Sequence, residues 1–210
     1  MASAKAGKSR GTVSSSLLKT MREALTVGAL PGENEGFGED QRKAAASFIL
    51  EVSKCRESGT ANIAADSFTN EDGRLATRIV INNADMPFLV DSASALLAEQ
   101  NIAVDRLIHP VLAAKRDKKG EFKLLAPSKN ESDHLESFIY FETARMDAKE
   151  RRGIEAALTR VIDDVRAAVD DWKKLQAKLA ENVDTLSGKE SGELLKWFGE
   201  NNLTLLAHER

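Results

Sequence analysis

Residues 81–100 read INNADMPFLVDSASALLAEQ, and this stretch decides how the rest of the chain is interpreted. A strand-like end and a polar Asn82-Asn83 pair are followed by a proline and then by apolar residues at helical spacing. We therefore predict a strand that turns directly into a helix over residues 86–100. Asp85 is a plausible N-cap for this helix, and Pro87 falls in the first turn, where a missing N–H is tolerated. Turns of this kind often hold ligands, so the turn is a candidate site.

The segments around this turn have strand character. Residues 61–68, 75–82, 102–117, 121–126 and 136–143 are rich in alternating or continuous apolar residues. We expect the third of these to be interrupted near His109-Pro110, because proline cannot donate a hydrogen bond to a neighbouring strand. The last is apolar on both faces, which indicates a central strand covered on both sides, or one with a face used in association.

Helical patterns lie on both sides of these strands. Two helices are predicted near residues 16–26 and 39–57, with a glycine-rich loop between them. Asp147 and Glu150 resemble a capping box, and the helix that they open keeps an apolar stripe for nearly thirty residues. Such a stripe is longer than one small sheet can cover, so we expect its far end to pack on another helix or another subunit. Residues 192–202 predict a last short helix.

The order strand, helix, strand, strand, helix, with a hairpin between the middle strands, predicts an α+β fold of the ferredoxin-like type, an antiparallel sheet with helices on one face. We expect a disordered tail at 1–15, a helical segment at 16–58 and an α/β domain at 59–182 that includes the long helix. Residues 183–210 should form a linker and the start of a next domain. Since LTLLAHER begins like a strand and then the sequence ends, we expect the sequence to be a piece of a larger protein.

Composition narrows the function classes. The chain has 210 residues with a net charge of −3 and charges of alternating sign, so nothing indicates a nucleic-acid footprint. One cysteine, Cys55, allows no disulfide within the chain and suits a reducing compartment, and the three histidines are too far apart in sequence for a metal motif. No apolar run approaches the roughly 18 residues of a membrane span. The basic, serine-rich start fits a mitochondrial transit peptide or a disordered tail. We interpret it as a tail and expect a cytoplasmic protein.

Several motifs together resemble one known family. The run Asp85-Met86-Pro87-Phe88-Leu89-Val90-Asp91-Ser92 precedes Ile108-His109-Pro110-Val111 and then Glu136-Ser137 with Glu142. This arrangement resembles the N-terminal region of the large bacterial NAD-specific glutamate dehydrogenases, over roughly residues 74–210. The final segment, ELLKWFGENNLTLLAHER, is similar to the next part of that family, although Leu203, Leu205, Ala207 and His208 depart from its pattern.

The resemblance implies a multidomain, oligomeric enzyme of amino-acid catabolism that oxidises glutamate to 2-oxoglutarate with NAD. Its N-terminal portion looks like an ACT-type domain, a regulatory fold that often senses amino acids. No G-x-G-x-x-G fingerprint follows a strand here, so we expect no catalytic residue, cofactor site or metal site in this chain, and NAD only in the parent enzyme. The expected partners are downstream domains of the same chain, a second copy, and an amino-acid effector, with no nucleic acid and no membrane.

The turn itself leaves alternatives open. In many ACT domains a small amino acid sits against a strand-to-helix turn whose glycine lets the ligand approach the backbone. Here Phe88 takes the place of that glycine. The candidate effector-binding turn comprises Asn82, Asn83, Asp85, Met86, Pro87 and Phe88. The other interpretation gives Asp85 a capping role, Met86 and Phe88 a core or interface role, and the two asparagines turn hydrogen bonds. The sequence thus predicts a non-catalytic regulatory and assembly domain, with an effector-sensing module and a purely structural oligomerisation domain as alternatives.

Overall fold

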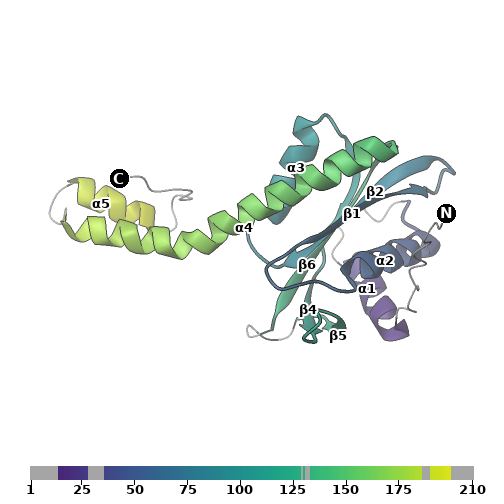
Figure 1. Ribbon diagram of the computed structural model, residues 1–210, viewed down its shortest axis with the longest axis horizontal. Coiled ribbons are helices and arrows are strands. Elements are labelled where there is room, and N and C mark those ends of the chain that lie inside the picture. Colours follow the sequence, from purple (N-terminus) through teal and green to yellow (C-terminus); the bar gives the residue numbers. More distant parts are fainter. Residues whose placement is uncertain (1–13, 28–35, 129, 131–132, 186–189, 200–210) are drawn as a thin grey trace, which may run out of the picture. The chain divides into compact units, whose positions relative to one another are not determined.

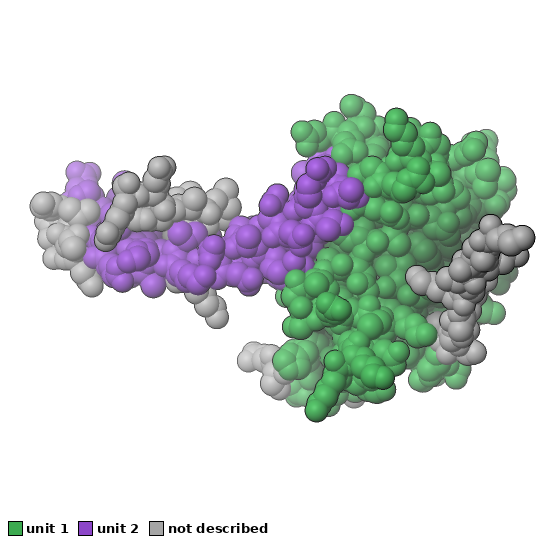
Figure 2. All heavy atoms as spheres, in the orientation of Figure 1, with its two compact units in different colours: residues 1–85, 97–155 green, residues 86–96, 156–210 purple. Residues whose placement is uncertain are grey.

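The structure is a computed structural model that describes residues 14–27, 36–128, 130, 133–185 and 190–199. Two compact units are distinguished, residues 1–85 with 97–155, and residues 86–96 with 156–210 (Figure 2). Most of the predicted tail, the predicted end strand and part of the predicted linker lie outside the described residues. The fold is α+β with an antiparallel sheet, an N-terminal helical pair and a long helix, as the sequence predicts (Figure 1).

Six strands form the sheet of the first unit (Figure 1). They are β1 (Asn62–Thr69), β2 (Leu75–Ala84), β3 (Val104–Ile108), β4 (Val111–Arg116), β5 (Phe122–Ala126) and β6 (Leu135–Ala144). The order along the sheet is β1-β2-β6-β4-β5, and β3 pairs with β6 as well. β6, the last of these six strands along the chain, therefore lies at the centre of the sheet.

The predicted break at His109-Pro110 is confirmed, and it explains how β6 acquires two neighbours on one side. β3 ends at Ile108 and β4 begins at Val111, so β6 pairs with β3 along one half of its length and with β4 along the other. Proline has no N–H to donate, but the carbonyl of Pro110 still accepts a 3.0 Å hydrogen bond from the backbone N–H of Phe138. The bend costs one donor and keeps β6 bonded along both of its halves.

Both faces of the central strands are buried. In the antiparallel register Val80 lies opposite Tyr140, and the neighbouring pair Ile79 and Phe141 projects to the other face. All four side chains are at most 1 % exposed. The prediction that the strand at 136–143 is central and covered on both faces is confirmed.

One face of the sheet is covered by the N-terminal helical pair, α1 (Ser15–Val27) and α2 (Glu39–Ser53). Ile49 and Leu50 of α2 share one hydrophobic core with Val80 and Phe138 of the sheet. The buried members of that core are Met21, Leu25, Phe37, Ala45, Ala46, Ile49, Leu50, Val80, Ile108, Leu112, Ala114, Leu125, Phe138 and Tyr140. The helical pair and the sheet thus bury one continuous apolar interior.

Arginines on the same face add polar links between sheet and helix. The guanidinium of Arg78 in β2 lies 4.1 Å from the ring centre of Phe48 and donates to the carbonyl of Ala44 at 3.4 Å. Arg106 of β3 lies 4.5 Å from the ring centre of Phe37 and pairs with Glu142 at 3.0 Å. Each arginine combines a stacking contact with a hydrogen bond, a geometry that suits its planar group.

The helix after the predicted turn begins later than the sequence indicates. α3 spans Leu89–Glu99, and its first hydrogen bond runs from the N–H of Ser92 to the carbonyl of Phe88. The predicted N-cap role of Asp85 is therefore wrong, because Asp85 lies four residues before the helix and its side chain accepts a bond from Ser137. Pro87 lies before the first turn rather than within it.

The long helix α4 spans Ala148–Thr185, and the short helix α5 spans Glu190–Trp197. The predicted capping box is confirmed: Asp147 accepts from the N–H groups of Lys149 and Glu150, and Glu150 accepts from the N–H of Asp147. None of the helices in the described part of the chain has the length and apolar character needed to span a bilayer.

Candidate functional site

The residues of the predicted effector turn divide into a buried group and an exposed group. Asn82 and Asn83 belong to β2 and are at most 1 % exposed, whereas Asp85, Pro87 and Phe88 are exposed and Met86 is half-buried. Both asparagines are expected to make hydrogen bonds within the turn. Asn83 makes one, since its side-chain amide donates to the carbonyl of Ala84 at 2.9 Å. Asn82 instead joins a buried ionic cluster in the sheet.

Phe88 stands where many ACT domains have a glycine, and its backbone conformation is one that favours glycine. Its φ is +70°, in the left-handed region, and its side chain is 45 % exposed. For a bulky L-residue this conformation costs roughly 1–2 kcal/mol, because Cβ approaches the carbonyl oxygen. The turn therefore keeps a glycine-like backbone while presenting a phenyl group where a glycine would leave open space.

A hydrogen-bonded chain begins at Asp85. The hydroxyl of Ser137 donates to Asp85 Oδ1 at 2.5 Å, and His109 Nε2 lies 3.0 Å from the same hydroxyl oxygen. Because a serine has one proton and Asp85 receives it, His109 Nε2 must carry the proton that it donates to Ser137. Burial lowers the pKa of His109, and the nearby Asp85 carboxylate opposes this by raising it. These hydrogen bonds connect the β3–β4 bend, β6 and the end of β2.

This hydrogen-bonded series contains serine, histidine and aspartate, but the three side chains are not arranged for nucleophilic catalysis. In such a triad the carboxylate orients the histidine and the histidine accepts the proton of serine. Here the carboxylate binds the serine directly, and Ser137 is fully buried. A hydroxyl that substrate cannot reach and whose proton is already committed does not act as a nucleophile.

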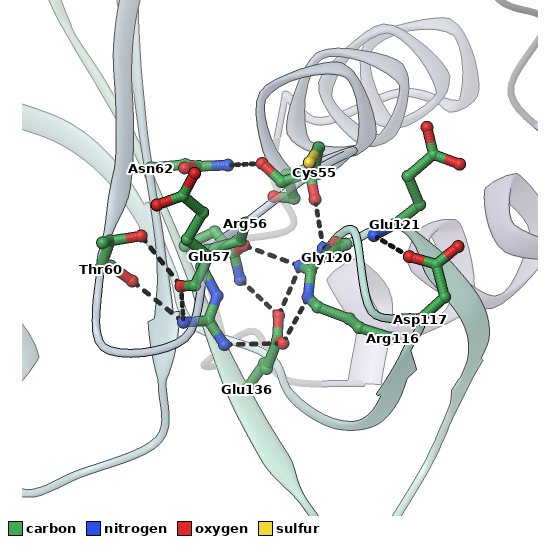
Figure 3. A network of polar contacts seen from close by, with 12 residues as sticks. Cys55, Arg56, Glu57, Thr60, Asn62, Arg116, Asp117, Gly120, Glu121 and Glu136 are labelled. Atoms are coloured by element: carbon green, nitrogen blue, oxygen red, sulfur yellow. Dashed lines mark hydrogen bonds and ion pairs between the residues drawn. The ribbon is translucent and has the colours of Figure 1, made fainter.

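A second polar group, the Glu136 cluster, consists of Glu136, Arg56, Arg116 and Asn82. Figure 3 shows Glu136 between the two arginines. Arg116 binds the Glu136 carboxylate through Nε and Nη2, both at 2.7 Å, and Arg56 Nη2 donates to it at 2.8 Å. Asn82 donates to Glu136 at 3.0 Å and accepts from Arg116 at 3.1 Å. A buried carboxylate thus receives hydrogen bonds from three side chains.

The electrostatics of the cluster favour the ionised form of Glu136. Burial on its own would raise the pKa of this carboxyl, but hydrogen bonds from Arg116, Arg56 and Asn82 outweigh that effect. The result is a pKa of about 2, below the ordinary value of 4.5. Glu136 is only 4 % exposed, so its charge depends on the two arginines.

The cluster joins four segments that are distant in sequence. Arg116 Nη1 donates to the carbonyls of Ser53, at the end of α2, and Gly120, in the β4–β5 turn, at 2.9 and 2.6 Å. The backbone N–H of Arg56 also donates to Gly120, at 3.1 Å. Gly120 has φ +80°, and an added Cβ would collide with the backbone carbonyl of Arg56. The loop after α2 and the hairpin turn are therefore held together closely at a point where only glycine fits (Figure 3).

A pocket of about 1090 Å³ lies over this cluster in the first unit. Its walls are the loop at 56–59, the end of β2 at Ala84-Asp85, the hairpin segment 114–120 and the segment 133–136. Asp85 is the residue of the predicted turn that lines this pocket, together with Arg56, Arg116 and Glu136. Five cationic and five carboxylate side chains line it: Arg56, Lys115, Arg116, Lys118, Lys119, Glu57, Asp85, Asp117, Asp133 and Glu136.

Other predicted roles have simple outcomes. The helix predicted over residues 39–57 ends earlier, because α2 ends at Ser53. Cys55 therefore lies just after the helix and is exposed, and its Sγ donates to the carbonyl of Lys119 at 2.9 Å. From the sequence, both tryptophans are interpreted as packing anchors. Trp172 is half-buried, and Trp197 is 50 % exposed with its ring 5.5 Å from that of Phe198. Within the described residues, no group of three or more His, Cys, Asp or Glu side chains is placed to hold a metal ion.

Sequence reasoning missed the Glu136 cluster. One signal was available: Glu136 opens a strand whose next residues are almost all apolar, which is unusual unless the carboxylate is paired. The partners carried no such signal, because Arg56 follows a helix and Arg116 ends a strand, both ordinary places for exposed charges. Their convergence depends on the sheet order, which places β4 beside β6.

Comparison with known proteins agrees with this architecture. A family model described as Glutamate dehydrogenase, ACT1 domain, matches residues 33–158, which include the helix α2, all six strands and the turn at Asp85. The chain belongs to this family. The match includes α2 as well as the sheet, in keeping with the shared core of the helical pair and the sheet in this ACT1 domain.

Individual relatives carry the same name. The NAD-specific glutamate dehydrogenase of Pseudomonas aeruginosa is 31 % identical over 146 residues, which cover 63 % of this chain. That of Halomonas elongata is 31 % identical over 147 residues, and that of Mycobacterium tuberculosis is 30 % identical over 149 residues. The matched part spans 9 % of the length of each of these relatives. The similarity thus concerns the ACT1 domain rather than the whole of those proteins.

Proposed function

We propose that this chain is the regulatory and assembly domain of an NAD-dependent glutamate dehydrogenase and contributes no catalytic group to it. The family match and the names of the relatives support the parent activity, the oxidative deamination of glutamate to 2-oxoglutarate. The arrangement of the polar groups supports the division of labour. Glu136, Arg56 and Arg116 are bound to one another or to backbone, and the hydroxyl of Ser137 donates to Asp85. None of these groups is poised to abstract a proton from a substrate.

The test compares the isolated chain with the parent enzyme. With glutamate and NAD, we expect the parent enzyme to form NADH and this chain alone to form none, measured by absorbance of the reduced cofactor. A second experiment adds the isolated chain to a parent enzyme that lacks the ACT1 domain, and measures the activity and the assembly of that enzyme. A change in its activity or assembly supports regulation, and NADH formation by the isolated chain itself would contradict the proposal.

The proposal includes downstream domains of the same polypeptide and a second copy as partners. Phe88 supports association, because an exposed phenyl group in a strained conformation costs free energy unless it makes a contact elsewhere. A cytoplasmic location is part of the proposal. It is supported by the single cysteine of the sequence, since a chain without a disulfide framework suits a reducing compartment.

A further inference from the structure

The strand β1 lies at one end of the sheet, so no other strand of the described residues pairs with its outer edge. In an antiparallel pair, backbone N–H groups point alternately towards the partner strand and away from it. The N–H of Ala65 bonds to a helix side chain, so the outward row consists of Ile63, Ala65, Ser67 and Thr69. An outward row of this kind is a template on which a further strand can pair.

Glu155 of α4 occupies the centre of this row. Its Oε1 accepts a hydrogen bond from the N–H of Ala65 at 2.7 Å. A strand that paired with β1 would lie about 4.8 Å away and would place a carbonyl oxygen where this carboxylate oxygen lies. Because a hydrogen bond to a carboxylate is stronger than one to a neutral carbonyl, strand addition would exchange a better bond for a weaker one.

Ser67, the next residue of the row, is held from two sides. Asp66 Oδ1 accepts from the N–H of Ser67 at 2.8 Å, and Arg78 fixes the other oxygen of Asp66 at 3.1 Å. Arg151 of α4 donates from Nη1 to Ser67 Oγ at 2.7 Å and to the carbonyl of Met146 at 2.9 Å. Both N–H groups at the centre of the row are thus bonded to carboxylates, and α4 is attached to β1 at a second place.

The row itself fits a second copy of the same strand. A two-fold axis through Ala65 would set the row against the identical row of another molecule, as in a symmetric dimer. None of the four residues of the row carries a charge, so no like charges would meet across this axis. Without the side chains that cover it, the β1 edge would therefore pair readily with its own copy.

We infer that Glu155, together with Asp66 and Arg151, closes the β1 edge to strand addition by a second copy of this chain. Copies then associate through other surfaces, and the exposed Phe88 is available for such a contact. The consequence for assembly rests on the proposed function, whereas the closure of the edge is a property of this chain alone.

The decisive variant is Glu155→Ala, which removes the acceptor at Ala65. We expect light scattering at high concentration to give this variant roughly twice the mass of the natural chain. Glu155→Gln keeps an oxygen that accepts the N–H, and Asp164→Ala removes an exposed carboxylate elsewhere on α4, so both should keep the natural mass. A Glu155→Ala chain with the natural mass at every concentration would overturn the inference.

A peptide with the sequence of β1, residues 62–69, identifies the surface. It should bind Glu155→Ala at least roughly tenfold more tightly than it binds the natural chain, because the edge of the natural chain is occupied. Equal binding to the two chains would contradict the closure. Association of Glu155→Ala that the peptide does not reduce would place the contact on another surface and would also overturn the inference.

Amide exchange in the natural chain tests the closure without a variant. The amide of Ala65 should exchange roughly tenfold more slowly than that of Thr69, the exposed member of the row. Equal rates would show that Glu155 does not hold Ala65. This result would overturn the inference even if Glu155→Ala does not fold.

The same experiments separate the closure from the proposed function. If Glu155→Ala associates while the natural chain is a monomer at every concentration, the closure stands and the association of natural copies fails. If the natural chain associates and Glu155→Ala has the same mass, the closure fails and the proposed association stands.

Discussion

Two single residues of this domain carry a conformational or an electrostatic cost. Phe88 holds a left-handed backbone without being a glycine, and Glu136 holds a negative charge almost without solvent. The two cases differ in where the compensation comes from. The Glu136 charge is stabilised inside the domain by Arg56 and Arg116, whereas the exposed phenyl group of Phe88 has no such stabilisation within the turn.

The strain at Phe88 is testable with a pair of variants. Phe88→Ala and Phe88→Gly both remove the phenyl group, but only glycine adopts φ +70° without a steric cost. We therefore expect the glycine variant to be more stable than the alanine variant by about 1 kcal/mol, measured by urea unfolding. At an ordinary helical or extended position the order would be reversed, so a more stable alanine variant would contradict the left-handed conformation.

The charge of Glu136 predicts a dependence of stability on acid. Its pKa is about 2 in the folded chain and 4.5 ordinarily, so the ionised form is favoured by folding. This stabilisation is complete above pH 4.5 and is lost as the pH falls from 4.5 towards 2, a total of about 3 kcal/mol. Glu136→Gln should lower the free energy of unfolding at pH 7 by at least this amount, because two buried guanidinium groups lose their counter-charge.

The measurement is the free energy of unfolding in urea at pH 7, 5 and 3.5. The difference between the natural chain and Glu136→Gln should shrink at the lowest pH. Asp163→Asn, which changes an exposed carboxylate of α4, is the control and should leave the curve nearly unchanged. A constant difference at all three values would show that Glu136 does not carry the proposed charge.

At the scale of the elements, the N-terminal helices and the sheet behave as one structure rather than as neighbours. Arg78 and Arg106 reach from the sheet to the helical segment, and Arg56 and Arg116 hold the loop after α2 to the β4–β5 turn. The boundary at residue 58 that the sequence indicates is a change of secondary structure. The core described above continues across it.

The core shared by the helices and the sheet predicts how a mutation in a helix affects the stability of the sheet. Ile49→Ala in α2 removes a fully buried side chain and should cost about 2–5 kcal/mol. Because α2 shares its core with β2 and β6, we expect a single unfolding transition, seen at the same urea concentration by circular dichroism and by amide exchange in the strands. Glu51→Ala on the exposed side of α2 is the control. Loss of the helices before the sheet would contradict the shared core.

Most elements were predictable from local pattern, and the failures have a common cause. The strands, the break at Pro110 and the cap at Asp147 follow from spacing, proline chemistry and capping residues, which act over a few positions. The role of Asp85 was mistaken because its partner, Ser137, is 52 positions away. The Glu136 cluster was missed for the same reason, since Arg56 lies 80 positions from Glu136. Contacts of this length depend on the order of the strands.

At the scale of the whole molecule, the self-association of the chain is open to a direct measurement. We expect light scattering to report a dimer or larger species at high concentration, and Phe88→Ala to shift it towards the monomer. Leu194→Ala changes another exposed apolar residue, at 52 % exposure, and tests whether any apolar truncation has the same effect. A monomer at every concentration would show that the assembly role requires other parts of the parent polypeptide.

The position of β6 has a consequence for the folding of the protein during its synthesis. A ribosome releases the chain from its start, at about 5–20 residues per second, so β1 and β2 emerge long before residue 135. Until then β2 has only β1 for a neighbour, and the strand that will lie between β2 and β4 does not yet exist. For several seconds the nascent domain therefore lacks its central strand, and the edge of β2 that later pairs with β6 is unpaired. We expect a chaperone that covers this edge during synthesis to raise the yield of folded protein.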